Sequence, residues 1–137
     1  MISNSMTSSV SPITVLEQTL ALRLGRRHCV VTGRAASAIY IALKALPGMP
    51  GKVVVPAITC PSPATVPLYA GFEPLFCDVR LLDFNMDPQA LKQLLETHND
   101  VAAIMPVHLY GQAAPLQEIL QIAKDNSVPV IEDSAQA

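Results

Sequence analysis

Short apolar runs, spaced along most of the chain, limit its possible folds most strongly. Residues 53–55 are consecutive valines that end at Pro56, and similar runs lie at 74–79, 101–107 and 128–131. Runs without polar alternation are typical of strands covered on both faces. Helical patterns separate these runs, and strands that alternate with helices form βαβ units. The sequence therefore predicts an α/β fold, a three-layer sandwich with a mostly parallel sheet.

Several segments between and before these runs carry helix signals. Ser11 and Asp87 are typical N-cap residues, and each is followed by a proline at the first helical position. Residues 34–46 are apolar nearly all round, which is typical of a buried helix. The predicted helices lie at 12–25, at 34–46, after the prolines that begin at 61, from 88 onward, and at 117–124.

Length and composition favour one globular domain without nucleic-acid or membrane partners. A hydrophobic fraction of 50% in 137 residues is sufficient for a core. A net charge of −2 provides no basic surface for nucleic acid. No apolar run is long enough for a membrane span, and no signal peptide is visible, so we expect a soluble cytoplasmic protein. We interpret 1–11 as a mobile tail and 12–137 as one domain.

The cysteines and histidines do not form a metal-binding pattern. Cys29, Cys60 and Cys77 fit no CxxC spacing, so we expect reduced and mostly buried thiols and no metal site. Cys60 can be read as a nucleophile, but no neighbouring base supports that reading, and a packed thiol is favoured. His108 lies at a strand end, either in a cleft or, as we favour, in a structural hydrogen bond.

Two segments are candidates for ligand chemistry. Residues 32–37 lead through small side chains into a helix, whose free amides can attract phosphate, although for this segment alone we favour a plain turn before a helix. Asp133 follows the last apolar run and can hold a protonated ring nitrogen, with Gln136 hydrogen-bonding a second group of the same ligand. The alternative for Asp133 is a helix cap before Ser134.

Five motifs, in order and spacing, resemble one known family. They are Thr-Gly-Arg-Ala-Ala-Ser-Ala-Ile at 32–39, Val-Val-Val-Pro-Ala-Ile-Thr-Cys at 53–60, Tyr-Ala-Gly-Phe-Glu-Pro-Leu-Phe-Cys-Asp-Val at 69–79, Pro-Val-His-Leu-Tyr-Gly-Gln at 106–112 and Val-Ile-Glu-Asp-Ser-Ala-Gln-Ala at 130–137. The chain resembles the amino-terminal part of the large domain of the DegT/DnrJ/EryC1/StrS aminotransferases. These are fold-type I transferases that use pyridoxal 5'-phosphate (PLP).

The resemblance implies a role for each of five residues. Ala36 and Ser37 match the pair at the cofactor phosphate, and Gln136 matches the glutamine beside the phenolic oxygen. Asp133 matches the aspartate that keeps the pyridine ring protonated, so that the ring can withdraw electrons from a carbanion. Cys60 stands where the family often has an aromatic residue that stacks on the ring, so only a weaker sulfur contact is expected there.

The resemblance also implies an activity and a limit to it. The whole protein is expected to be a homodimer that transfers an amino group from an amino acid to a keto-sugar or a similar small molecule. The family's Schiff-base lysine follows the last motif by some tens of residues, and no lysine present here matches it (Lys44, Lys52, Lys92 and Lys124). We therefore expect no catalytic residue within this segment and no transamination by the 137-residue chain alone.

Two other classes of function fit parts of the sequence. A non-catalytic module that completes its sheet with another chain is suggested by the sheet edge and apolar helix faces that such a segment leaves uncovered. A Rossmann-like nucleotide binder is disfavoured because the glycine fingerprint is missing. Titration with PLP and NAD separates the aminotransferase segment from the nucleotide binder.

Overall fold

A computed structural model describes residues 10–137, which divide into two compact units with the boundary after Gly33. The first unit contains helix α1 (Pro12–Arg23). The Ser11 hydroxyl caps this helix by accepting a hydrogen bond from the Ile13 amide at 3.3 Å, as predicted. Gly25 follows the helix with a positive φ of 61°. The predicted tail lies almost wholly outside the described residues, and the predicted domain range, 12–137, remains a prediction.

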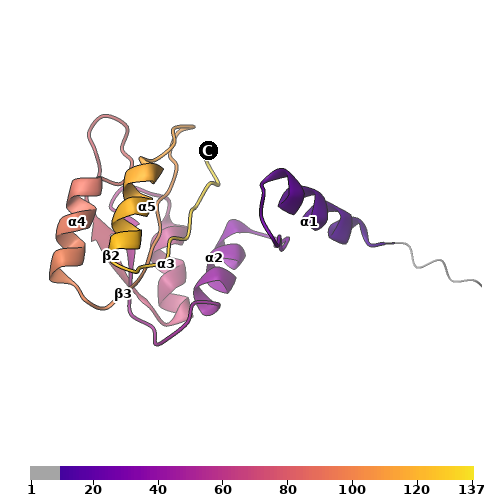
Figure 1. Ribbon diagram of the computed structural model, residues 1–137, viewed down its shortest axis with the longest axis horizontal. Coiled ribbons are helices and arrows are strands. Elements are labelled where there is room, and N and C mark those ends of the chain that lie inside the picture. The colour runs from indigo at the N-terminus through magenta and orange to yellow at the C-terminus, as the bar shows by residue number, and fades with distance from the viewer. Residues whose placement is uncertain (1–9) are drawn as a thin grey trace, which may run out of the picture. The chain divides into compact units, whose positions relative to one another are not determined.

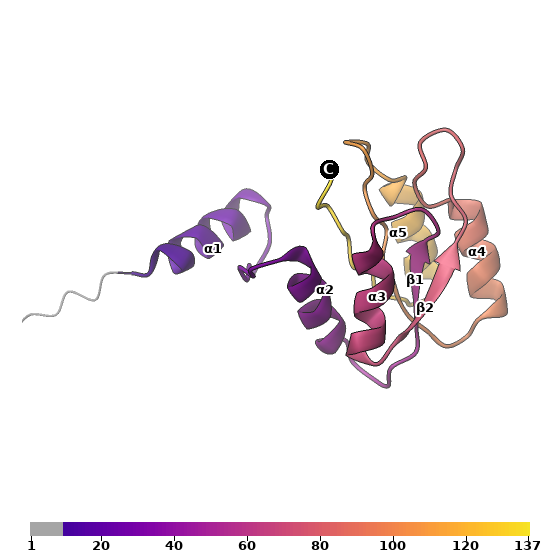
Figure 2. The same cartoon turned by 180° about the vertical axis from the view of Figure 1, so that it is seen from behind.

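The second unit, Arg34–Ala137, is built on a parallel sheet. Its strands are β1 (Lys52–Pro56), β2 (Glu73–Cys77) and β3 (Val101–Ile104), and their order is β2-β1-β3. Figure 1 labels β2 and β3, and Figure 2 labels β1 and β2. Its helices are α2 (Ala35–Lys44), α3 (Pro61–Ala70), α4 (Pro88–Thr97) and α5 (Leu116–Asp125). The valine run therefore forms the central strand, as its continuous apolar character predicts.

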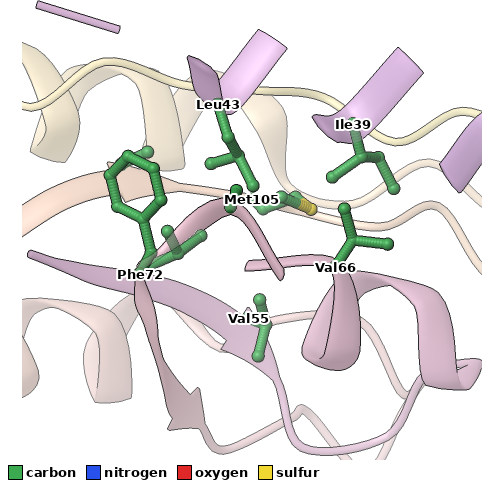
Figure 3. Close-up of a cluster of buried hydrophobic side chains, with 9 residues drawn as sticks. Ile39, Leu43, Val55, Val66, Phe72 and Met105 are labelled. Atoms are coloured by element: carbon green, nitrogen blue, oxygen red, sulfur yellow. The ribbon is translucent and has the colours of Figure 1, made fainter. Parts of the chain in front are cut away.

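The sheet is covered by helices on both faces. Val53 and Val55 pack with α2 and α3, whereas Val54 packs with α4 and α5. Figure 2 shows the same two layers of helices from behind, and Figure 3 shows Val55 beneath side chains of both α2 and α3. All three valines are fully buried. The three-layer α/β sandwich with a parallel sheet is thus confirmed.

The predicted strand at 128–131 is only partly formed. Val130 makes a single parallel bridge with Ile104, and its side chain is half-buried rather than covered on both faces. The Ile104 amide donates to the Pro129 carbonyl at 3.0 Å, and the Ile131 amide donates to the Ile104 carbonyl at 2.9 Å. Pro129 has no N–H to add to this ladder, so a regular strand does not continue through it.

Helix α2 is less buried than its composition predicts. Among its apolar side chains, Ile39 and Leu43 are buried against the sheet, whereas Tyr40 and Ile41 are 41% and 49% exposed. The helix contacts the sheet along one face, so its other apolar side chains remain at the surface. The prediction of a wholly buried helix was wrong for this reason.

Helix α3 begins at its prolines and contains Pro67, as predicted. Gly71 ends it in the left-handed conformation, with φ of 89°. Glycine adopts this conformation without the steric cost that a side chain would add. In the part of the chain that the structure describes, no helix combines the length and apolar character needed to cross a membrane.

Candidate functional site

The carboxyl edge of the sheet holds Asp133. Its amide donates to the Pro106 carbonyl at 3.0 Å, and its carbonyl accepts from the His108 amide at 3.1 Å. These two bonds fix the backbone of Asp133 beside the segment that follows β3. The side chain is 8% exposed, so this carboxylate is largely shielded from water. A shielded carboxylate at this edge of a parallel sheet is well placed to contact a bound ligand.

The Asp133 carboxylate also makes a local hydrogen bond. Its Oδ1 atom accepts from the Ala135 amide at 3.0 Å, which is the cap-type interaction considered as the alternative reading. Residues 135 and 136 form a turn, however, and not the start of a helix. This bond orients the carboxylate through one of its two oxygens.

A hollow of about 300 Å³ lies between α2 and the segment that contains Asp133. The α2 wall consists of Ile39 and of three small side chains, Ala35, Ala38 and Ala42. Because the alanine side chains are small, the hollow leaves room beside the carboxylate. The arrangement thus brings the first turns of α2 and Asp133 to one cavity.

The amino terminus of α2 is available to an anion. Arg34 is the N-cap residue and makes no side-chain capping bond, and the first turn contains no acidic residue. The helix dipole and the amides of the first turn therefore favour a negatively charged group there. Such a group would lie at the end of the helix that borders the hollow.

Three other predicted site residues, Ala36, Ser37 and Gln136, do not line this hollow. Ala36 is half-buried and Ser37 exposed, and both line a neighbouring apolar hollow of about 360 Å³ with Tyr40 and Tyr69. Gln136 has an exposed side chain, and its carbonyl accepts from the Gly111 amide at 3.0 Å. The roles predicted for these residues remain predictions.

Cys60 is exposed and forms the N-cap of α3, without a side-chain capping bond. It lines neither of the two hollows described above. The prediction of mostly buried thiols was correct for Cys77 and wrong for Cys60, and Cys29 is half-buried. The N-cap position at the carboxyl end of β1 explains the difference, because the thiol there is beyond the end of the covered strand.

The thiols are expected to react with iodoacetamide at very different rates. Burial, followed by the nearby carboxylates of Asp87 and Asp78, raises the pKa of Cys77 to about 12. At about pH 8 almost none of Cys77 is in the reactive thiolate form, and its sulfur is also shielded. Peptide mass spectrometry should therefore find label on Cys60 and not on Cys77 in the folded protein, and on both in urea. Equal labelling in the folded state would contradict this assignment.

His108 has a structural role, as the sequence analysis favoured. Its side chain is 5% exposed. Nδ1 accepts from the Ala114 amide at 2.9 Å, so the ring proton lies on Nε2, which donates to Glu132 Oε1 at 2.8 Å. The Ser134 hydroxyl donates to the same Glu132 oxygen at 3.2 Å. Glu132 thus orients His108 and the segment next to Asp133.

Substitution of His108 by phenylalanine is expected to lower the free energy of unfolding by about 2–3 kcal/mol, because the buried Ala114 amide loses its acceptor. Glu132→Gln is the matched control, since its amide oxygen can still accept from Nε2, and it should cost less than about 1 kcal/mol. Urea denaturation followed by circular dichroism measures both values. Equal stability of the two variants would argue against this role for Nδ1.

None of the four lysines lines the Asp133 hollow, and Lys92 lies on α4. Lys44 is in the last turn of α2, Lys124 is in the last turn of α5, and Lys52 begins β1. Lys52 Nζ donates to Asp100 Oδ2 at 2.6 Å, and this hydrogen bond raises the pKa of Lys52 above its usual value. A lysine held in its charged form at the amino edge of the sheet is a poor nucleophile.

Asn85 was missed by the sequence analysis. It is fully buried in the segment between β2 and α4. Its Oδ1 accepts from the Leu109 amide at 3.3 Å, and its Nδ2 donates to the Gln112 carbonyl at 3.4 Å. A single polar residue inside a turn has no periodic signal, so only the folded structure shows that it joins two segments at the carboxyl edge.

The fold and this site define a class of protein. Parallel α/β proteins bind small ligands at the carboxyl edge of the sheet, and here a shielded carboxylate and an uncapped helix terminus border one hollow. The chain belongs to the DegT/DnrJ/EryC1/StrS aminotransferase family, whose model matches residues 1–137.

Several known proteins are similar to the chain. It is 35% identical over 126 residues to GDP-perosamine synthase of Caulobacter vibrioides, which covers 91% of the chain and 33% of that protein. It is also 35% identical over 126 residues to UDP-2-acetamido-2-deoxy-3-oxo-D-glucuronate aminotransferase of Pseudomonas aeruginosa, covering 91% and 34%. The chain therefore spans about a third of the length of these relatives.

A solved structure confirms the predicted fold class. The crystal structure of NtdA from Bacillus subtilis with bound cofactor PMP matches with a TM-score of 0.87 and 31% identity, covering 94% of the chain and 29% of that structure. The described segment therefore has the fold of part of a fold-type I aminotransferase large domain, as the sequence resemblance implied.

Proposed function

We propose that this chain forms part of the cofactor site of a PLP-dependent aminotransferase. The observation that carries the proposal is the shielded Asp133 carboxylate, which lines the same hollow as the first turns of α2. Membership of the aminotransferase family supports it. So does the similarity to a structure whose title names PMP as its bound cofactor.

The residues around the hollow suit the chemistry of PLP. A phosphate carries negative charge and fits the uncapped amino terminus of α2. A protonated pyridine nitrogen carries positive charge and fits a shielded carboxylate such as Asp133. A volume of about 300 Å³ lies at the lower end of the usual range for small-ligand sites. On the α2 side, Ile39 is the one large side chain that lines this volume, beside three alanines.

Each residue has a separate part in the proposed site. PLP, when bound, acts as an electron sink for a carbanion formed on the amino acid. Asp133 holds the proton on the ring nitrogen, and the Ala135 amide keeps the carboxylate oriented. Ala36, Ser37 and the other first-turn amides of α2 hold the phosphate. By the family resemblance, Gln136 would donate to the phenolic oxygen, and Cys60, which lines neither hollow, would supply a sulfur contact to the ring face.

We propose an amino acid as donor and a keto-sugar as acceptor for the whole protein. The names of the two relatives above, a perosamine synthase and a 3-oxo-sugar aminotransferase, support this substrate class. We further propose that the whole protein is a cytoplasmic homodimer. The exposed apolar side chains Tyr40, Ile41 and Tyr69 on α2 and α3 provide a surface on which a second copy can pack.

Calorimetric titration of the purified chain with PLP, pyridoxal and NAD tests the proposed cofactor. We expect PLP to bind most tightly, because only PLP offers both a phosphate and a pyridine nitrogen that can be protonated. The nicotinamide nitrogen of NAD is bonded to ribose and cannot take up a proton. Pyridoxal, which lacks the phosphate, should bind at least about tenfold more weakly, since a charge-assisted interaction contributes about 1.5–3 kcal/mol. Preferential binding of NAD would instead identify a nucleotide binder and overturn the proposal.

A further inference from the structure

Asn85 has a fully buried side chain and lies in the segment between β2 and α4. Its backbone is held on both sides, because its amide donates to Asp83 Oδ1 at 3.0 Å and its carbonyl accepts from the Arg80 amide at 2.9 Å. The side-chain amide then reaches across to Leu109 and Gln112, accepting from the first and donating to the second. An apolar side chain at this position could make neither bond.

The two residues that Asn85 contacts are the ends of a tight turn. The Gln112 amide donates to the Leu109 carbonyl at 2.9 Å, and these residues form an antiparallel bridge. The residues between them, Tyr110 and Gly111, both have positive φ, of 56° and 74°. Tyrosine rarely adopts this conformation, so the surrounding contacts must hold it.

This turn is hydrogen-bonded to the segment that follows Asp133. The Gly111 amide, at the tip of the turn, donates to the Gln136 carbonyl at 3.0 Å. Asp133 itself is paired with the residues just before the turn, through Pro106 and His108. Hydrogen bonds from the Asn85 side chain hold both ends of the turn, and the backbone of the turn leads to the hydrogen bond between Gly111 and Gln136.

We infer that Asn85 is a positioning residue of the proposed cofactor site, which it serves by fixing the turn at 109–112 and, through Gly111, the backbone of Gln136. This inference rests on the proposed function. Asn85 does not touch the cofactor. The Asn85 side chain acts through the turn. Its Oδ1 accepts from the N–H at one end of the turn and its Nδ2 donates to the C=O at the other end, so both groups of the side-chain amide are needed.

Amide hydrogen exchange measured by NMR tests the positioning directly. In Asn85→Ala, the Gly111 amide is expected to exchange at least about tenfold faster, because local opening of the turn becomes easier. The Met105 amide, which donates to the Val54 carbonyl at 2.8 Å inside the sheet, should change much less. Equal acceleration at Gly111 and Met105 would mean general destabilisation and would overturn the inference.

The matched control is Asn126→Ala, which removes an exposed asparagine whose Nδ2 donates to the Ile122 carbonyl at the end of α5. It should leave the Gly111 exchange rate unchanged. If Asn85→Ala does not fold, Asn85→Ser keeps a smaller polar group and should show the same local effect in weaker form. No change at Gly111 in that folded variant would count against the inference.

Binding of PLP tests the link to the cofactor site. We expect Asn85→Ala and Gln136→Ala each to weaken PLP binding about tenfold, and the double variant to bind no more than about threefold more weakly than Gln136→Ala alone. Such non-additivity indicates that the two residues act along one path. Fully additive losses would overturn the inference. If the unaltered chain binds no PLP, the proposed function fails, whereas faster Gly111 exchange would still support the positioning of Gln136 by Asn85.

Discussion

Substitution of Asp133 by asparagine is expected to weaken PLP binding about 100-fold. Asparagine keeps an oxygen that can accept from the Ala135 amide, so the local turn should be preserved. It lacks the negative charge that matches a protonated pyridine nitrogen, and hydrogen bonds to charged groups contribute about 1.5–3 kcal/mol. The dissociation constant from calorimetric titration measures the effect, with about 1.4 kcal/mol for each tenfold change.

Asp125→Asn is the matched control for this substitution. Asp125 lies at the end of α5, and its exposed carboxylate accepts from Gln121 Nε2 at 2.8 Å. This variant removes one negative charge away from the hollow and should change the affinity for PLP less than about twofold, as expected for an exposed charge. Equal affinity of the Asp133→Asn variant and the unaltered chain would show that the Asp133 carboxylate does not contact the ring nitrogen.

Substitution of Gly51 by alanine is expected to lower the free energy of unfolding by about 3 kcal/mol. A Cβ atom at this position would lie 2.3 Å from the Asp100 carbonyl oxygen. That oxygen accepts from the Lys52 amide at 2.8 Å, and the Gly51 carbonyl accepts from the Glu73 amide at 3.0 Å. Neither backbone can move aside without loss of a bond between strands, so the added methyl group produces strain in the packed sheet.

Gly33→Ala provides the comparison for the Gly51 variant. A Cβ atom on Gly33 meets no other atom within 4 Å, and its φ lies outside the left-handed region. Its free energy of unfolding should therefore change by less than about 0.5 kcal/mol. Urea denaturation followed by circular dichroism gives both values, and a Gly51→Ala variant as stable as the Gly33→Ala variant would contradict the predicted clash.

The layers of the fold were predictable because local pattern and burial agree along β1. Consecutive valines at 53–55 have alternating side chains, and all are buried, so both faces of the strand must be covered. The exposure of Tyr40 and Ile41 on α2 was not predictable in this way. Composition shows that a helix is apolar, but only packing against distant residues shows which of its faces is covered.

The site was predictable only in part, for a related reason. Asp133 stands at the end of an apolar run, and the end of a parallel strand has a known place in the fold. Nothing in the neighbouring sequence marks Asn85, because its two partners, Leu109 and Gln112, are distant in the sequence and come close to it only in the folded structure. The exposure of Cys60 likewise depends on where β1 ends and α3 begins.

The strand order has a consequence for how the site forms during synthesis. The central strand β1 can pair with β2 as soon as β2 has emerged, before β3 is made. Val130 then joins β3 through a single bridge with Ile104, and Asp133 makes a single bridge with Val107, in the segment after β3, so no continuous ladder forms. Because synthesis proceeds from the amino terminus and distant contacts form slowly, the Asp133 carboxylate reaches its place after the sheet already exists. A nascent chain should thus gain its core before it gains affinity for a ligand.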